Sequence, residues 1–182
     1  MANHMTKTEL ENCIFAYGKD IYAFCRQLTY SRQEAEELYQ DTFLKAMELL
    51  QKINASENPK SYLLSIALRL WKNKKRKHAW RKQIASMVSI TEESDLDLIK
   101  AAAFTPETSF LQREESDLVR RAVGNLPEKL KITVLLFYME DLSVTQISHI
   151  LKIPAGTVKS RLHHARNQLK KELEVVLDEK YR

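Results

Sequence analysis

Cationic and hydrogen-bonding side chains are concentrated in one segment near the end of the chain, after Pro154. They are Thr157, Lys159, Ser160, Arg161, His163, His164 and Arg166. At helical spacing they form one polar face. Short or imidazole side chains on such a face can hydrogen-bond to base edges in the DNA major groove, while Lys and Arg hold phosphates. The pattern predicts DNA binding, although a solvated face on a packing helix carries similar charges.

The elements around this face indicate how it is positioned. Asp141-Leu142-Ser143 predicts a turn and a helix cap, and a short apolar helix containing Ile147 follows. After a tight turn, Val158 and Leu162 continue the apolar stripe on a longer helix. Two helices that pack through such stripes across a tight turn form a helix-turn-helix, whose second helix enters the major groove.

A second cationic segment runs from Arg69 to Lys82 and contains eight Lys or Arg residues and no acid. Contact with a nucleic-acid backbone fits this run better than a merely solubilising face does. Tyr62, Trp71 and Trp80 neighbour the run and can stack on unpaired bases, with core packing favoured for Trp71. The net charge of +5 agrees with a polyanionic partner.

Other candidate chemistry is weak. His163 and His164 are adjacent on a helix and point about 100° apart, which makes them a poor chelating pair. The chain has no Cys-x-x-Cys or His-Glu-x-x-His spacing, no Gly-rich phosphate loop and no distinct Ser/His/Asp set. We therefore expect no metal, no cofactor and no intrinsic enzymatic activity.

The cysteines and the hydropathy indicate a compartment. Cys13 and Cys25 lie twelve residues apart in one predicted helix, about 18 Å at 1.5 Å per residue. Disulfides need less than about 7 Å between Cα atoms, so we expect two buried thiols in a reducing environment. No stretch reaches the roughly 18 apolar residues of a membrane span, and no signal peptide is evident. The sequence predicts a cytoplasmic protein without membrane insertion.

Apolar residues recur at three- and four-residue steps in both halves, which predicts helices throughout. In the first half these residues are Ile14, Tyr17, Ile21, Phe24 and Leu28, then, after a Ser31 cap, Ala35, Leu38, Phe43, Met47 and Leu50. Asn58-Pro59 predicts the start of a third helix, with Asn as its cap. Phe137 and Tyr138 fall on an apolar stripe in the second half and are expected in its core. No alternating strand pattern is present.

The middle of the chain loses this periodicity. Residues 84–115 are acidic, with Glu92, Glu93, Asp95 and Asp97, and predict a flexible linker that holds at most a short helix near residues 96–103. We therefore expect an all-α protein of two small domains, residues 6–83 and 116–179. Residues 1–5 resemble a cloning scar ahead of a native start and are left out of the expected fold.

Three runs in the second half occur in fixed order: Asn125-Leu126-Pro127-Glu128, Leu142-Ser143, and Ile153-Pro154-Ala155-Gly156-Thr157-Val158 continuing to Arg166. Together they closely resemble region 4 of the extracytoplasmic-function (ECF) sigma factors of RNA polymerase. In the first half, Ala35-Glu36-Glu37-Leu38-Tyr39-Gln40-Asp41-Thr42-Phe43-Leu44-Lys45-Ala46 and Tyr62-Leu63-Leu64-Ser65-Ile66-Ala67 resemble region 2 of the same family. The two matches cover most of the chain.

The resemblance implies an alternative sigma factor that directs core RNA polymerase to specific promoters and assists melting of the −10 element. Its implied partners are core RNA polymerase, promoter DNA and a cognate anti-sigma protein. By resemblance Glu36, Glu37, Gln40, Asp41 and Leu44 bind core polymerase, and the polar face after Pro154 reads the −35 element. The −10 element is assigned to Asn58, Lys60, Ser61, Tyr62, Arg69, Lys72, Lys75 and Arg76, with residues 53–60 capturing a base flipped out of the stack.

Three departures from the family pattern leave the preferred promoter open. Leu68-Arg69 stands where an Arg-Asn pair is common, and His163-His164 stands where an aromatic residue or Arg is frequent. Lys152 occupies a turn position that often holds Gly. If that position is left-handed, Lys costs roughly 1 kcal/mol relative to Gly.

Two rival functions remain at this point. A stand-alone helix-turn-helix regulator would dimerise through an apolar stripe and bind a palindrome without polymerase. A protein-interaction adaptor would place its basic faces against an acidic partner and would not bind DNA. Transcription in vitro with core polymerase, with and without this protein, discriminates among all three.

Overall fold

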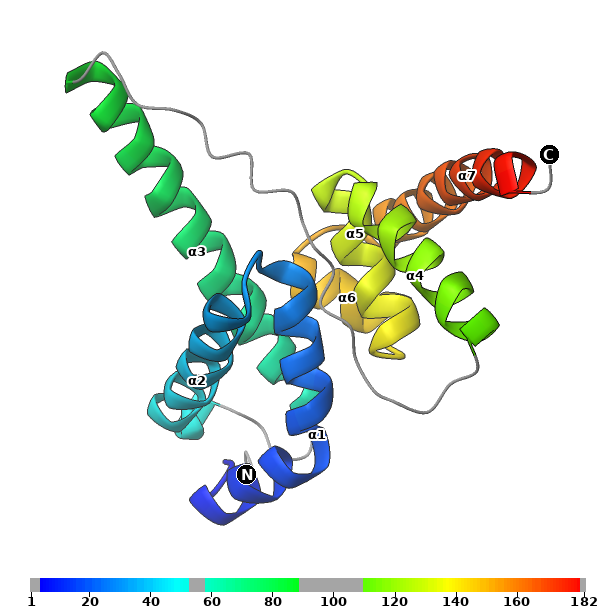
Figure 1. Ribbon diagram of the computed structural model, residues 1–182. Helices are drawn as coiled ribbons and strands as arrows, with labels where there is room; N and C mark the ends of the chain where they lie inside the picture. The colour runs from blue at the N-terminus through cyan, green and yellow to red at the C-terminus, as the bar shows by residue number, and fades with distance from the viewer. Residues whose placement is uncertain (1–3, 53–57, 89–109, 181–182) are drawn as a thin grey trace. The chain divides into compact units, whose positions relative to one another are not determined.

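The computed structural model describes residues 4–52, 58–88 and 110–180 (Figure 1). The chain divides into two compact units, residues 1–99 and 100–182. Within the described ranges all regular secondary structure is helical, which confirms the predicted all-α class. The predicted linker acids, the short helix near residues 96–103 and most of the −10 loop lie outside the described residues.

Three long helices form the N-terminal unit: α1 (Lys7–Leu28), α2 (Arg32–Glu48) and α3 (Pro59–Val88), with the short 3-10 turn η1 (Leu50–Lys52) after α2. Side-chain oxygens cap their first turns, because the first N–H groups of a helix have no partner within it. The Thr6, Ser31 and Asn58 side chains accept from the N–H groups of Glu9, Glu34 and Ser61, respectively. The predicted helix starts at Ser31 and at Asn58-Pro59 are thus confirmed.

The three helices pack pairwise around one apolar core. Its members at 2% exposure or less include Leu10, Ile21, Phe24, Leu38, Leu63, Leu64 and Ile66. Cys13 and Cys25 are buried with them, as predicted. Only the first part of α3 takes part, because every side chain from Lys74 to Ile84 is exposed. Figure 1 shows α3 continuing beyond α1 and α2.

Some sequence expectations for this unit were wrong. Met5, set aside with residues 1–5, is buried at 5% exposure ahead of the Thr6 cap. Ile14 and Met47, expected on apolar stripes, are 39% and 47% exposed. Residues 84–88 continue α3, and α4 already begins at Phe110, so both helices reach into the range predicted as linker.

The C-terminal unit consists of α4 (Phe110–Asn125), α5 (Glu128–Val134), the π-helical turn η2 (Leu135–Met139), α6 (Val144–Leu151) and α7 (Ala155–Lys180). Helix α7 packs against α4, α5 and α6. Buried residues from these elements and from the turns between them form the core, among them Ala122, Leu126, Leu136, Leu142, Ile147, Val158, Leu162 and Ala165.

The expectation that Tyr138 is a core residue was wrong, because its side chain is 53% exposed. It lies in η2, where the Glu140 N–H donates to the Leu135 carbonyl at 3.1 Å, five residues back. A π-helical turn holds one residue more than an α-helical turn, which shifts the register of the apolar stripe. Phe137 remains half-buried and packs edge-on against the Tyr138 ring, with 4.9 Å between centroids.

Candidate functional site

Helix α7 presents the predicted DNA-reading residues on its outer side. Val158, Leu162 and Ala165 are buried in the core, so the positions between them face outward. Of the seven predicted residues, Thr157 and Arg161 are half-buried, and Lys159, Ser160, His163, His164 and Arg166 are exposed. The structure therefore brings all seven together on the first turns of one helix.

Contacts within α7 orient several of these side chains. The His163 Nε2 lies 3.1 Å from the Asn167 Nδ2, and the His163 and His164 rings meet edge-on at 6.0 Å. The Arg166 Nε donates to the Leu162 carbonyl at 3.3 Å, so this side chain runs back along its own helix. Among the described residues, no acidic side chain forms an ion pair with Lys159, Arg161 or Arg166. Their positive charges thus remain available to an anionic ligand.

The turn before α7 fixes its angle to α6. Ser143 and Gln146 form a reciprocal capping box that starts α6. Lys152 ends α6 in the left-handed conformation, at φ 54° and ψ 50°. The Ile153 N–H then donates to the Ser148 carbonyl at 3.1 Å, and the chain turns at Pro154 into α7. These contacts produce the predicted helix-turn-helix.

The residues predicted for the −10 element fall into two groups on α3. Those at the helix start hold the fold: Asn58 caps the helix, the Ser61 N–H donates to it, and Tyr62 is half-buried. The Lys60 ammonium lies 2.9 Å from the Asp20 carboxylate, and its side chain is only 15% exposed. The other group, Arg69, Lys72, Lys75 and Arg76, is exposed. The structure thus presents four of the eight predicted side chains as an open cationic surface.

Aromatic residues beside these cations differ in their exposure. Trp71 is half-buried, and the Lys75 Nζ lies 5.3 Å from its ring centroid, within cation–π range. Trp80 is 63% exposed. The Arg76 Nη2 donates to the Asn73 Oδ1 at 3.2 Å, which holds its guanidinium near the helix surface.

Helix α2 carries the residues predicted to bind core polymerase, and all five are exposed. Glu36 pairs with Arg32 one turn earlier, at 2.8 Å. The Glu37 carboxylate accepts from the Lys74 ammonium of α3 at 2.8 Å, and the Asp41 carboxylate lies 4.0 Å from the same nitrogen. The hydrogen bond from Lys74 lowers the pKa of Glu37. Sequence reasoning missed this role of Lys74, because no local spacing connects residues 37 and 74.

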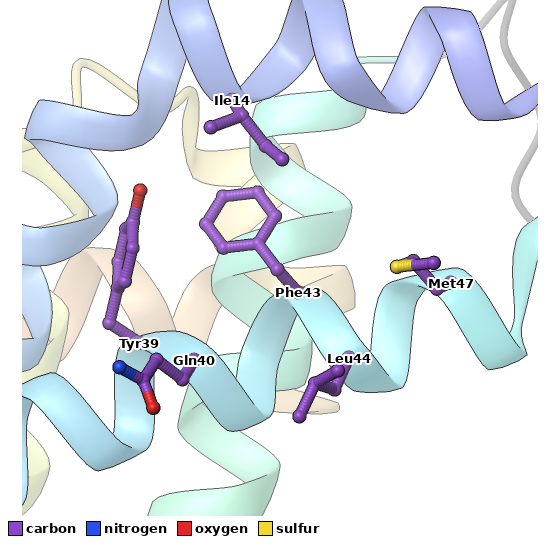
Figure 2. A pocket seen from close by; sticks show the side chains of 6 residues that line it. All are labelled: Ile14, Tyr39, Gln40, Phe43, Leu44 and Met47. Carbon is purple, nitrogen blue, oxygen red and sulfur yellow. The ribbon is translucent and has the colours of Figure 1, made fainter.

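The helix that carries these acids also lines an open apolar groove (Figure 2). It is lined by Ile14 of α1 and by Tyr39, Gln40, Phe43, Leu44 and Met47 of α2. The Tyr39 ring packs edge-on against Phe43 and Tyr22, with centroids 5.0 and 5.7 Å away. Burial raises the pKa of the Tyr39 hydroxyl. Leu44 is 60% exposed at the groove, so α2 combines carboxylates with uncovered apolar surface.

Gly18 lets α1 pack closely against Tyr39 of α2. A Cβ at position 18 would lie 2.9 Å from the Tyr39 hydroxyl oxygen, closer than Cβ atoms come to other atoms. A glycine inside a helix costs about 1 kcal/mol relative to alanine. Its presence in the middle of α1 was the one sequence signal for this close contact.

Within the described part of the chain, no three His, Cys, Asp or Glu side chains are grouped closely enough to hold a metal ion. No helix in those same ranges combines the length and apolarity needed to cross a membrane.

Comparison with known proteins gives matches over both units. The family described as Sigma-70 region 2 matches residues 14–81, and Sigma-70, region 4 matches residues 116–169. The ECF RNA polymerase sigma factor SigW of Bacillus subtilis is 30% identical, over 86% of this chain and 84% of SigW. An ECF RNA polymerase sigma-E factor of Haemophilus influenzae is 27% identical, over 81% of this chain and 78% of its own.

Solved structures share the fold. The sigma factor RpoE from Bartonella quintana, crystallised with the anti-sigma factor NepR, superposes with a TM-score of 0.69 at 23% identity. That match covers 91% of this chain and 96% of RpoE. CnrH, solved with the cytosolic domain of CnrY, superposes with a TM-score of 0.64 at 16% identity, over 93% of this chain and 90% of CnrH.

Proposed function

Because the chain belongs to the ECF RNA polymerase sigma factors, which are alternative sigma factors in transcription initiation, we propose which of its surfaces contacts each partner. Helix α2 binds core RNA polymerase, α3 contacts the −10 element, and α7 reads the −35 element. The role requires no catalytic step by this chain, and its place is the cytoplasm, where polymerase and promoter DNA are found.

The observation that carries the polymerase assignment is the face of α2. Exposed Gln40 and Leu44 lie at the groove, and Glu37 and Asp41 lie on the same helix. Protein interfaces combine an apolar centre with a charged rim, and opposite charge at the rim selects the partner. A partner with an apolar side chain flanked by cations complements this face.

The α7 assignment rests on two kinds of contact at different places on one helix. Lys159, Ser160, His163 and His164 lie near the start of α7 on its exposed side and suit base edges. Arg161 and Arg166 lie toward the flanks and suit phosphates. The half-buried Thr157, in the first turn, supports the approach of the helix to DNA.

On α3 the exposed cations make the proposed DNA contacts, and the residues at the helix start place them. Arg69, Lys72, Lys75 and Arg76 would neutralise backbone phosphates near the −10 element. Asn58, Lys60, Ser61 and Tyr62 fix the start of α3, next to the loop proposed to capture a flipped base. Flipping a base costs a few kcal/mol, which stacking and a shaped pocket must offset.

The test is transcription in vitro with core polymerase alone and with core polymerase plus this protein. Promoter-specific transcripts are expected only when the protein is present. Gln40→Ala combined with Asp41→Arg should weaken core polymerase binding while leaving the circular dichroism spectrum native. Unchanged affinity in a titration of that double variant would remove α2 as the polymerase surface. Binding of this protein to a palindromic DNA site without polymerase would support the stand-alone regulator instead.

A cognate anti-sigma protein is the third partner we propose. Among solved structures with this fold, RpoE was determined in complex with the anti-sigma factor NepR, and CnrH in complex with the cytosolic domain of CnrY. The exposed groove on α2 and the exposed cations of α3 offer large surfaces for such a protein to cover. Co-purification of a protein that blocks core polymerase binding would support it, and full activity of the chain in its own cells without any inducing stress would contradict it.

A further inference from the structure

Lys74 joins the helix proposed to face DNA to the helix proposed to face polymerase through ion pairs with two carboxylates. The Lys74 Nζ of α3 lies 2.8 Å from the Glu37 Oε2 and 4.0 Å from the Asp41 Oδ2, both on α2. The three side chains are each about half exposed, at 50%, 51% and 51%. The contact is therefore open to solvent and to a competing partner.

Lys74 differs from its neighbours in the basic run of α3. Exposed Lys72 and Lys77 form no ion pair within the described residues, whereas Lys74 lies against two carboxylates. Glu37 and Asp41 lie one helical turn apart, a spacing at which like charges repel. A cation near both carboxylates relieves that repulsion.

The same two acids form part of the proposed polymerase surface, and this inference rests on that proposed function. A cationic group of the polymerase and the Lys74 ammonium would compete for the same carboxylate oxygens. Exposed ion pairs are weak and are screened by salt, so replacing one cation by another is easy. Once displaced, the Lys74 ammonium is an additional uncompensated positive charge on α3.

We propose that Lys74 is an exchangeable charge that holds Glu37 and Asp41 in the free sigma factor, is displaced when core polymerase binds, and then contacts the promoter backbone. Before assembly, the two carboxylates offset the charge of Lys74 and reduce its contribution to DNA affinity. After assembly, it adds one phosphate contact. The exchange thereby favours DNA binding by the polymerase complex over DNA binding by the free subunit.

The test measures core polymerase binding by Lys74→Gln, with Lys77→Gln as the matched control on the same helix. At low salt, Lys74→Gln should bind core polymerase about two- to fivefold more tightly than wild type, because the acids no longer have to release a cation. Lys77→Gln should bind like wild type. The gain should disappear at high salt. Equal or weaker binding by Lys74→Gln, or an equal gain in both variants, would overturn the proposal.

Two further measurements separate this inference from the proposed function. If Glu37→Gln with Asp41→Asn leaves core binding unchanged, the polymerase surface itself is misassigned. If that pair weakens binding, adding Lys74→Gln to it should produce no gain, and a persisting gain overturns the exchange. In the assembled complex, Lys74→Gln should lower the salt slope of promoter binding by about one. An unchanged slope overturns the release of Lys74 to DNA.

Discussion

The two units build their candidate sites in different ways. In the C-terminal unit, the proposed −35 residues lie between Thr157 and Arg166 on one helix, and their described contacts stay within that helix. In the N-terminal unit, the proposed polymerase surface depends on three helices: Ile14 of α1 and Leu44 of α2 line the groove, and Lys74 of α3 pairs with the α2 acids in the free protein.

This difference decides what each site depends on. A site on one helix needs that helix to be held at the correct angle, so its integrity depends on the core beneath it. A site assembled from three helices also needs side chains distant in sequence to meet, as Glu37 and Lys74 do. Mutations in one unit should therefore affect that unit's binding and leave the other unit's binding intact. Within each unit, core substitutions should lower stability, and surface substitutions should lower binding.

The largest expected effect is on the C-terminal core. Ile147 is fully buried beneath α7, and Ile147→Ala should lower the stability of this unit by about 2–5 kcal/mol. The −35 contacts should be lost while core polymerase binding through α2 persists. Chemical denaturation and a polymerase titration measure the two properties. Thr145→Ala, an exposed change on the same helix, is the control and should leave both properties unchanged. If Ile147→Ala loses polymerase binding to the same extent as the −35 contacts, the two units are not independent.

The apolar groove of the N-terminal unit should give the next largest effect. Leu44→Asp places a charge at the groove and should weaken core polymerase binding about tenfold or more, as expected for an apolar residue central to an interface. Phe15→Asp is the matched control, because Phe15 is 90% exposed and does not line the groove. Similar losses in both variants would indicate that added negative charge, rather than the groove, matters.

On α7 two substitutions should separate base reading from phosphate binding. His164→Ala should cost about 1–3 kcal/mol and change the preferred base at one −35 position. Arg166→Ala should weaken binding to all sequences alike and lower the salt slope by about one. Transcription from promoter variants at several salt concentrations measures both effects. If neither substitution changes the base preference or the salt slope, this side of α7 is an ordinary solvated helix face.

The smallest effect concerns the turn before α7. Because Lys152 has φ 54°, Lys152→Gly should stabilise the C-terminal unit by about 1 kcal/mol. Lys152→Ala keeps the unfavourable conformation of a residue with a Cβ and should bring no such gain. Urea denaturation of wild type and the two variants compares their stabilities. If Lys152→Ala gains as much stability as Lys152→Gly, the gain comes from loss of the lysine side chain.

The sequence by itself determined the all-α class, the family and the position of the helix-turn-helix. These features depend on spacing within one segment: caps at Ser31, Asn58 and Ser143, and an apolar stripe that leaves the polar residues between Thr157 and Arg166 on the outer side of the helix. Local chemistry dictates each of them, because a cap or a stripe acts over one or two helical turns.

Only the tertiary structure decided which charges of the N-terminal unit form ion pairs and which of its apolar side chains stay exposed. The run from Arg69 to Lys82 contains no acid along the chain, yet Lys74 meets Glu37 and Asp41 across the α2–α3 contact, and Lys60 meets Asp20. The stripe on α2 predicted burial of Met47, but α1 covers only part of that stripe, and the uncovered part is the groove. The physical reason is that ion pairing and burial depend on which side chains meet through space, and helical periodicity does not specify the neighbour.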